Sequence, residues 1–404
     1  GLDNAEVNYD NNRNMHYACS IDIEAGKLTN QKQSGRCWMF AALNTMRVDI
    51  INKYNLENFE LSQSYPLFYD KLEKANYFLE SILDTLDEPT DGRLIAWLLS
   101  APMNDGGQWD MFKNLVEKYG VVPQYAMPES FHSANTARMN KLLTLKLREY
   151  ACTLREGYAA GSKPEELRGQ KQGMMDEIFH MLCVCLGKPP KKVRMQVRDK
   201  DKELVEGAWM TPQEYYQTYV GWDLDEYVSL INAPTADKPF GKTYTVKMLG
   251  NVKEGKQIKY LNIPLEQFKA AAIAQLKAGE VVWFGCDVAQ WLNRDWGAMD
   301  MQAFDYPLVL GTGFGLTKRQ RLDYGESLMT HAMVFTGVDM DGEAPLRWKV
   351  ENSWGEKGGN KGWYIMADNW FDEFMYQVVV KKQYLPEDLV KQYEQAPIEL
   401  QPWD

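Results

Sequence analysis

The sequence predicts an α+β protein in which helices dominate the first part of the chain and strands the last part. Up to Asn232, apolar residues recur at helical spacing in most segments. After Asn232, β-like segments alternate with turn residues. With 404 residues, the chain is long enough for two or three domains, or for one large core with insertions. We therefore predict a helical lobe in 1–130, a helical insertion in 131–232, a β-rich lobe in 233–390 and a C-terminal tail in 391–404.

The composition is that of a globular protein. Hydrophobic residues make up 45% of the chain and charged residues 25%. The net charge of −11 argues against nucleic acid as the main partner, although a local basic face remains compatible with it. The sequence contains no apolar run of about 18 residues, so we expect no transmembrane helix.

The cysteines fit neither a zinc site nor a disulfide framework. Their spacings match no zinc pattern, and the sequence from Cys183 to Cys185 is not a Cys-x-x-Cys motif. A chain of this length with so few cysteines favours a reducing compartment. We therefore expect no metal site at these cysteines. The cysteines are Cys19, Cys37, Cys152, Cys183, Cys185 and Cys286.

Periodicity and turn residues divide the helical part into elements. A strand is expected at Tyr17–Ile23. The paired glycines in Asp105–Asp110 form either a plain turn or a close backbone approach to a ligand. The basic run Lys188–Lys202 is either a solvated loop or a docking surface. Helices are expected from Cys37 to about Lys53, from after Pro66 to Ile82, and at Leu94–Leu99, Trp109–Tyr119, Met139–Cys152, Pro164–Leu186 and Thr211–Tyr219.

The last part is expected to form strands around one main helix. Pro264–Ala278 has helical spacing and ends at Gly279. Asp339–Glu343 is a good hairpin loop, so the strands on either side of it should pair. The expected strands are Thr243–Leu249, Gln257–Ile263, Val281–Cys286, Leu328–Val338, Leu346–Glu351, Gly362–Ala367 and Gln377–Val380.

A candidate nucleophile stands at the start of the first long helix. Ser34 and Gly35 are helix-start residues, so Cys37 falls in the first turn. Free backbone N–H groups and the positive end of the helix dipole favour the thiolate there, and so lower the pKa of the thiol. Gln31 can fold its amide back towards the Cys37 N–H, and two such donors form an oxyanion hole. A lone cysteine beside Trp38 is nevertheless more often a small buried hydrophobe.

The candidate general base is one of four histidines. His331 heads the apolar strand Thr330–Val338, where a hydrogen-bonded structural histidine is the common case. His180 lies within a predicted helix and is the weaker candidate, whereas His16 and His132 lie in polar surroundings. We therefore take His331 as the candidate base.

Asn352 supplies the third group. It follows the strand that should pair with the His331 strand, so the two residues can lie side by side. An Asn carbonyl that accepts from one imidazole nitrogen sets the tautomer and the orientation without adding charge. Trp354 can lie over the pair and exclude water. A thiol at a helix start, a Gln before it, a distant His and an Asn-Ser-Trp-Gly sequence together indicate a papain-like cysteine peptidase.

Longer motifs carry a more specific resemblance. They are Gln33–Ala41, Gly106–Trp109, Trp283–Asp287, Gly325–Met333 and Val350–Gly355. Together they resemble the bleomycin hydrolase/aminopeptidase C family, with the lactic-acid-bacterial members closest. The resemblance covers essentially the whole chain.

This resemblance implies roles for the motif residues. By it, Cys37 is the nucleophile, His331 the base, Asn352 the residue that orients the base, and Gln31 an oxyanion-hole donor. The resemblance also implies a papain-like two-lobed core with a helical insertion, peptide substrates, no cofactor, and a cytoplasmic homohexamer with its active sites facing an inner chamber.

The substrate-binding residues follow from the same resemblance. Gly107, with Gly106 beside it, matches the glycine whose backbone pairs with the substrate chain, and Trp354 borders the site. In this family the C-terminal tail lies in the cleft, and its carboxylate binds the substrate's free amino group. We therefore place Asp404, the last residue, among the substrate-binding residues.

Relatives continue for several small apolar residues beyond the point where this sequence stops. Either the final residues are missing from the sequence, or the tail is short and the cleft more open. An open cleft would permit endopeptidase action.

The predicted function is a cysteine peptidase that forms a thioester acyl-enzyme on Cys37, most simply an aminopeptidase. One alternative is an oligopeptide endopeptidase of the same family. A remote alternative is a non-enzymatic scaffold that binds nucleic acid or a partner through Lys188–Lys202, which predicts salt-sensitive binding. The acidic net charge argues against that scaffold.

Overall fold

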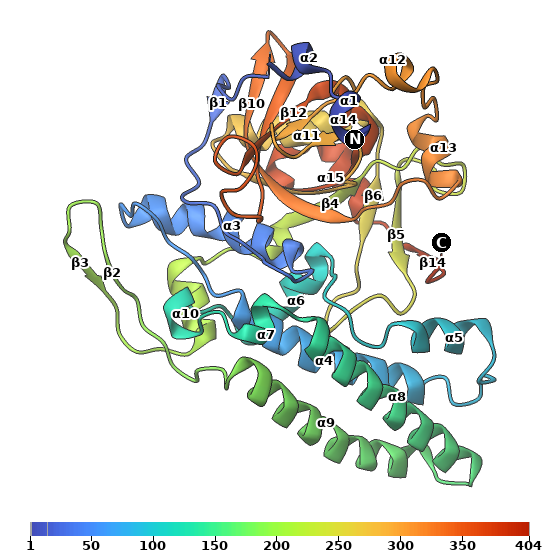
Figure 1. The fold of residues 1–404 in the computed structure, drawn as a ribbon. Helices are drawn as coiled ribbons and strands as arrows, with labels where there is room; N and C mark the ends of the chain where they lie inside the picture. The colour runs from blue at the N-terminus through green and yellow to red at the C-terminus, as the bar shows by residue number, and fades with distance from the viewer. Residues whose placement is uncertain (1, 14, 404) are drawn as a thin grey trace.

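A computed structural model describes residues 2–13 and 15–403 and shows a sheet-rich part above a helical part (Figure 1). The strands are β1 (Ile21–Asp22), β2 (Gln196–Arg198), β3 (Leu204–Glu206), β4 (Tyr227–Ile231), β5 (Lys242–Val246), β6 (Tyr260–Asn262), β7 (Val282–Cys286), β8 (Leu292–Asn293), β9 (Ala298–Met299), β10 (His331–Asp341), β11 (Ala344–Glu351), β12 (Trp363–Ala367), β13 (Met375–Lys381) and β14 (Ile398–Leu400). Twelve of these described strands form one mixed sheet in the order β14-β5-β6-β4-β13-β7-β10-β11-β12-β9-β8, with β1 beside β10. β2 and β3 form a separate ribbon.

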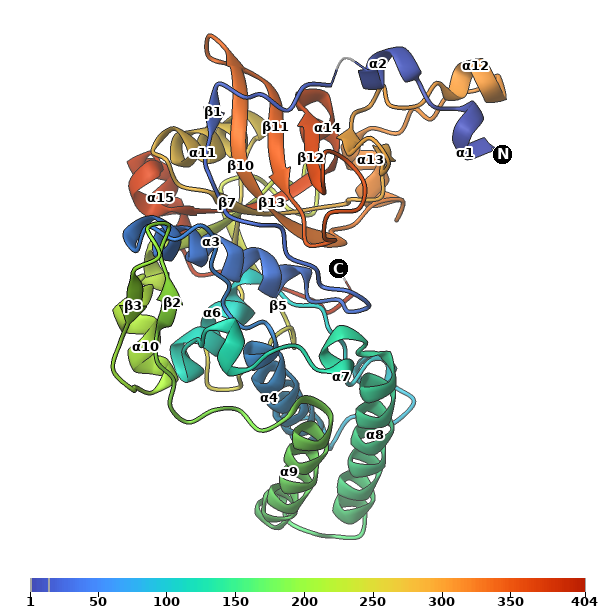
Figure 2. The same cartoon turned by 60° about the vertical axis from the view of Figure 1, so that its left-hand side comes forward.

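Of the described helices, one group packs on the sheet, another is stacked below it, and a few short helices lie to one side of the sheet (Figure 2). They are α1 (Leu2–Ala5), α2 (Tyr9–Arg13), α3 (Cys37–Lys53), α4 (Ser64–Leu83), α5 (Arg93–Ser100), α6 (Trp109–Tyr119), α7 (Phe131–Ala134), α8 (Ala137–Ala159), α9 (Pro164–Leu186), α10 (Pro212–Tyr219), α11 (Leu265–Lys277), α12 (Tyr306–Leu310), α13 (Lys318–Asp323), α14 (Asp368–Phe374) and α15 (Glu387–Tyr393).

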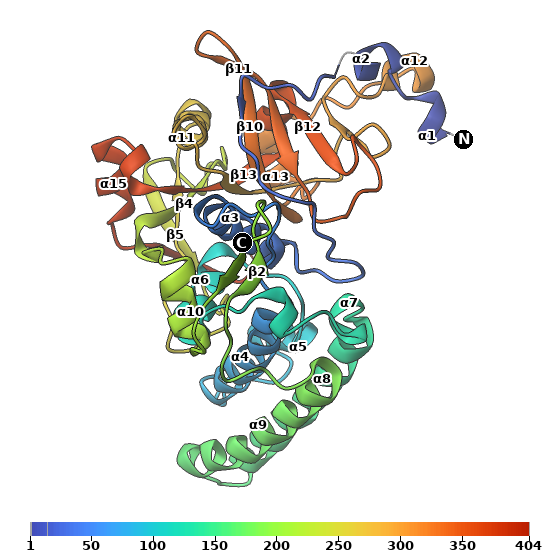
Figure 3. The ribbon, with the colours of Figure 1, turned by 90° about the vertical axis from the view of Figure 1, so that its left-hand side faces the viewer.

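The central strands bury side chains on both faces of the sheet. Successive side chains on a strand point to opposite faces. On β7, Val282 and Phe284 therefore join the core that contains α11, whereas Trp283 joins the core that contains α3. Figures 2 and 3 show α3 between the sheet and the remaining helices of the lower part. The helix that begins at Cys37 thus lies between the two parts of the molecule.

The two longest helices of the predicted insertion, α8 and α9, pack against α4 at the end farthest from the sheet (Figure 2). Their buried residues Leu143, Leu147, Ile178 and Leu182 belong to the same core as α3 and α4. The domain limits at 131 and 232 remain a prediction, because shared packing joins these helices to the first lobe.

Most predicted elements are present, with differences at their ends. β1 covers only the end of the predicted strand, because only its last residues pair with β10. The strand expected from Leu328 begins at His331, since Leu328 is exposed. β4 was not expected, and it lies inside the predicted insertion. Its residues are buried on both faces between β13 and β6, so it lacks the polar alternation that marks a strand in the sequence.

A buried ion pair joins α3 to the sheet. The Arg47 guanidinium donates to the Glu351 carboxylate at 2.9 Å, and both side chains are almost wholly buried. Arg47 also donates to the Lys27 carbonyl at 2.6 Å. Burial raises the pKa of Glu351 to about 7, although Arg47 opposes the shift. Because Glu351 ends β11 and Asn352 follows it, this pair fixes α3 relative to the residue predicted to orient the base.

We expect Arg47→Met to lower the free energy of unfolding by about 3–5 kcal/mol, because it leaves the Glu351 carboxyl buried without its partner. Urea denaturation measures the loss. The control is the double variant Arg47→Met/Glu351→Leu, which removes both charges and should be more stable than the single variant. Equal stability of the single variant and the unmodified protein would show that the pair does not hold the two parts together.

Candidate active site

The Cys37 thiol lies at the first residue of α3. The preceding residue, Arg36, makes no side-chain cap. The backbone N–H groups of Ala332, Trp38 and Cys37 lie close enough to the sulfur to favour its thiolate. Ala332 comes directly after His331, so this contact places the thiol beside the start of β10.

The hydrogen bonds of Asn352 fix the tautomer of His331. The Ser353 backbone N–H, which can only donate, lies 2.8 Å from Asn352 Oδ1. The same oxygen lies 2.9 Å from His331 Nε2, so Nε2 must carry the proton and donate. In the neutral imidazole, Nδ1 is then the acceptor. His331 therefore keeps one basic nitrogen free for another group.

Burial acts on both titratable groups and disfavours their charged forms. It raises the pKa of the Cys37 thiol, against the opposing effect of the backbone N–H groups. The prediction that the helix start lowers the pKa of the Cys37 thiol is therefore wrong. Desolvation raises this pKa by more than the backbone N–H groups lower it. Burial also lowers the pKa of His331 to about 4, although the Asn352 hydrogen bond raises it, and the Arg294 charge lowers it further.

Cys37 and His331 line the same cavity. The cavity has a volume of about 270 Å³ and opens between the start of α3, the start of β10 and the segment before α6. The structure thus brings Gln31, Cys37, Gly106, Gly107 and His331 to one place. Sequence analysis gave no site role to the other lining residues, which are Gly35, Trp38, Gln108, Trp283, Met329, Thr330 and Ala332.

Gln31 is held by Ser353, a contact that the sequence analysis missed. The Ser353 hydroxyl donates to Gln31 Oε1 at 2.6 Å, and the Gln31 backbone N–H donates to the Ser353 carbonyl at 2.8 Å. Gln31 Nε2 donates to the Ser34 carbonyl at 2.6 Å, which leaves its second N–H for another acceptor. The position of Ser353 directly after Asn352 was the signal in the sequence.

The Gly106–Gly107 segment forms one wall of the cavity. A Cβ atom on Gly107 would lie 2.5 Å from the Trp38 ring, so this close approach requires glycine. The Trp38 indole is itself held by a 2.7 Å hydrogen bond from Nε1 to the Asp105 carbonyl.

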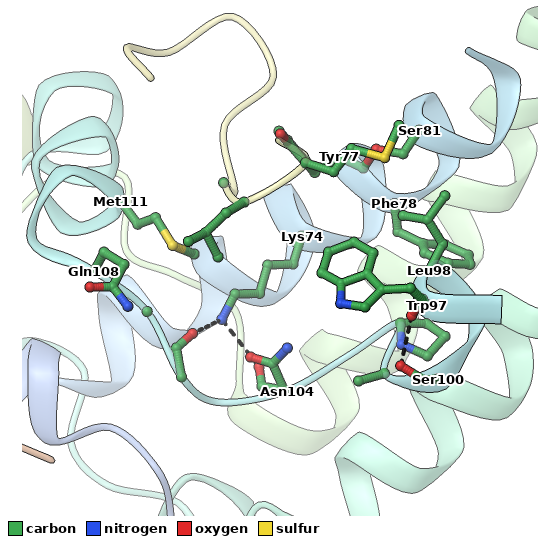
Figure 4. Close-up of a pocket in the computed structure, with 17 residues that line it drawn as sticks. Lys74, Tyr77, Phe78, Ser81, Trp97, Leu98, Ser100, Asn104, Gln108 and Met111 are labelled. Carbon is green, nitrogen blue, oxygen red and sulfur yellow. Dashed lines mark hydrogen bonds between the residues drawn. The ribbon is translucent and has the colours of Figure 1, made fainter. Parts of the chain in front are cut away.

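A second cavity, of about 340 Å³, shares Gly106, Gly107 and Gln108 with the first (Figure 4). Phe78, Trp97 and other apolar side chains of α4 and α5 line it.

Trp354 contacts His331 but does not line the first cavity, and no described residue of the tail lines it. The Trp354 ring lies over the His331 imidazole, with the ring centroids 4.9 Å apart. The Arg294 guanidinium lies 4.9 Å from the centroid of the Trp354 ring. Asp404 lies outside the described residues. Before it, β14 pairs in parallel with β5, and the Arg93 guanidinium lies 4.0 Å from the Trp403 ring centroid.

Comparisons with known proteins decide the family. The Peptidase C1-like family matches residues 1–404. The chain belongs to this family. It is 47% identical to "Aminopeptidase C" of Lactobacillus delbrueckii subsp. lactis over 388 residues, which is 95% of this chain and 86% of that protein. It is 46% identical to "Bleomycin hydrolase" of Gallus gallus over 393 residues, which is 95% of this chain and 86% of that protein.

A solved structure agrees with this family. The crystal structure of PepW from Lactobacillus rhamnosis shares 50% identity and a TM-score of 0.98, over 100% of this chain and 91% of that one. The predicted resemblance and the α+β papain-like fold are therefore confirmed. This member of the Peptidase C1-like family is a papain-like cysteine peptidase of the aminopeptidase C/bleomycin hydrolase type. Of its described helices, none combines the length and apolar character that crossing a bilayer needs.

We expect Gly107→Ala to lower the free energy of unfolding by about 1–3 kcal/mol, because the added methyl overlaps the anchored Trp38 ring. Gly106→Ala is the matched control. Its Cβ would meet only Asn104 Oδ1, at 3.7 Å, so its stability should change by less than about 0.5 kcal/mol. Chemical denaturation of both variants makes the comparison, and equal losses at the two positions would contradict the steric argument.

Proposed function

We propose that this peptidase is an aminopeptidase that releases N-terminal residues from peptides through a thioester on Cys37. The observation that carries the proposal is the cavity that Cys37 and His331 both line, with the His331 tautomer fixed by Asn352. The aminopeptidase assignment also rests on relatives of 47% identity that carry the name "Aminopeptidase C".

The reaction begins with a neutral pair. His331 Nδ1 takes the thiol proton while Cys37 Sγ attacks the carbonyl carbon of the scissile bond. The oxyanion accepts hydrogen bonds from the Cys37 backbone N–H and from the free N–H of Gln31 Nε2. The imidazolium then gives its proton to the leaving amine, and the C–N bond breaks to leave a thioester. Water, deprotonated by His331, hydrolyses the thioester and regenerates the thiol.

The buried environment of Cys37 and His331 favours a pair of opposite charges that forms during the reaction. Burial disfavours an ionised thiol and an ionised imidazole separately. When both form together, each stabilises the other in a site of low dielectric. The Trp354 ring over the imidazole limits access of water to it.

The substrate chain lies along the Gly106–Gly107 segment, with peptides as the substrate class. The homohexamer and the cytoplasmic location implied by the family resemblance stay predictions. The relatives' names give no support to the endopeptidase alternative, and the family membership gives none to the scaffold alternative.

Two substrates test the proposal. One is an amino-acid fluorogenic amide with a free amino group, and the other is a peptide with a blocked N-terminus and an internal cleavage site. We expect turnover of the first only, and Cys37→Ala should abolish it while the fold, followed by circular dichroism, is kept. Comparable cleavage of the blocked peptide would make the enzyme an endopeptidase. Activity retained in Cys37→Ala would remove Cys37 from the role of nucleophile.

The pKa of His331 predicts the acid limb of the pH profile. The general base must be neutral, and a pKa of about 4 keeps it neutral down to pH 5. We therefore expect kcat/KM to hold at pH 5 and to fall as the pH drops through about 4. Because the folded pKa lies below the ordinary value of 6.5, the unfolded chain binds this proton first, so the same group lowers stability as the pH falls from about 6.5 to about 4. Tryptophan fluorescence at each pH separates inactivation from unfolding. An acid limb centred at 6.5 would contradict the prediction.

A further inference from the structure

The start of the predicted insertion contacts the loop that precedes Cys37. This segment, Ala134–Asn140, joins α7 to α8. The Gln33 backbone N–H donates to the Ala134 carbonyl at 3.0 Å, and the Thr136 N–H donates to the Gln33 carbonyl at 3.3 Å. A short β-bridge therefore ties the nucleophile loop to the insertion.

The same segment holds Asp105, which directly precedes the Gly106–Gly107 wall of the cavity. The Thr136 hydroxyl donates to Asp105 Oδ2, and Asn140 Nδ2 donates to Oδ1 at 2.7 Å. The Gly35 backbone N–H donates to the same carboxylate at 2.9 Å. Asp105 thus connects the insertion, the residue two before Cys37 and the segment that contains Gly107.

Two lysines of α4 also donate hydrogen bonds to Asp105 and to the backbone around it. Lys71 Nζ donates to Asp105 Oδ1 at 2.6 Å and to the Asn104 carbonyl at 2.7 Å. Lys74 Nζ donates to the Gly106 carbonyl at 2.6 Å and to the Asn104 carbonyl at 3.2 Å (Figure 4). Both lysines are buried. The backbone on either side of Asp105 is therefore fixed by charge-assisted hydrogen bonds.

The Asp105 carboxylate is ionised when it accepts these bonds. Burial raises its pKa, but the Lys71 ammonium and the hydrogen bonds from Gly35 and Thr136 hold the pKa of Asp105 well below its usual range. An ionised carboxylate can accept from all four donors at once.

We propose that Thr136 and Asp105 are positioning residues that fix the distance between the Cys37 loop and the Gly106–Gly107 edge. Neither residue lines the cavity, so neither touches the reacting atoms. Through these two residues, the helical insertion holds the Cys37 loop and the Gly106–Gly107 edge in place for catalysis. We call this arrangement the brace. This inference rests on the proposed function, because the proposed function places the substrate chain along the Gly106–Gly107 edge.

Substitution of Thr136 tests the brace. Thr136→Val removes the hydroxyl at nearly constant volume, and Thr136→Ser keeps it. A misplacement of about 1 Å can cost up to about 100-fold in rate. We expect kcat/KM on the amino-acid amide to fall at least about tenfold in Thr136→Val, and Thr136→Ser to stay within about twofold of the unmodified enzyme. The control is Thr153→Val, the same change at an exposed position of α8 whose hydroxyl bonds only within its own helix.

Alkylation by iodoacetamide supplies the readout that a structural role would not give. This small reagent needs the Cys37 thiol but not the Gly106–Gly107 edge. We expect the rate of Cys37 alkylation in Thr136→Val to stay within about threefold of the unmodified enzyme while peptide hydrolysis falls. If Thr136→Val does not fold, Asn140→Ala removes another donor to Asp105 and should shift the same ratio in the same direction.

The outcomes separate the two claims. The brace is overturned if Thr136→Val keeps kcat/KM within twofold, or if Thr136→Ser loses as much as Thr136→Val. The proposed function fails instead if the unmodified enzyme, once alkylated on Cys37, still turns over the amide.

Discussion

The burial of α3 between the sheet and the helical part is the constraint on which the site depends. Of its 17 residues, 13 are buried, and they surround the helix axis. A helix that is apolar on all sides must be enclosed by other elements. The core that contains α3 also contains Trp283 and Ala332 of the sheet and residues of α4 and α6, so α3 cannot slide or rotate without breaking packing on both sides. Its first residue, Cys37, is thereby placed beside the start of β10, which is His331.

This enclosure also sets the electrostatics of the site. Burial disfavours the charged form of each group taken alone, and so raises the pKa of the Cys37 thiol and lowers the pKa of His331. The same low dielectric strengthens the attraction between two opposite charges that appear together. The site therefore disfavours a lone thiolate, which would react with any electrophile, and favours charge separation when a carbonyl carbon is in place to be attacked.

The sequence predicted the elements whose pattern is local. The helical spacing from Cys37 and the hairpin around Gly342 are visible within about 20 residues, and the structure has both. The predicted site residues other than Trp354 and Asp404 either line one cavity or bond to a residue that does, although their roles remain proposals.

What the sequence did not predict depends on burial and on contacts between distant segments. β4 lacks polar alternation because both of its faces are covered. The raised pKa of Cys37 follows from desolvation, which no local motif reports. The bond from Thr136 to Asp105 joins residues 31 positions apart. Thr136 stands at the N-cap position of α8, and Asp105 begins a segment with the pattern of a turn, so neither local pattern points to the other residue.

The Asn-Ser-Trp sequence after β11 links parts of the site that would otherwise be independent. Asn352 fixes the imidazole, Ser353 holds the Gln31 amide, and Trp354 covers the imidazole ring. Because these residues are consecutive, one backbone position sets the base and the oxyanion donor together. The Ser353 N–H also orients the Asn352 amide, so the main chain itself determines which His331 nitrogen is basic. A shift of this segment would therefore disturb the proton acceptor and the oxyanion hole at the same time.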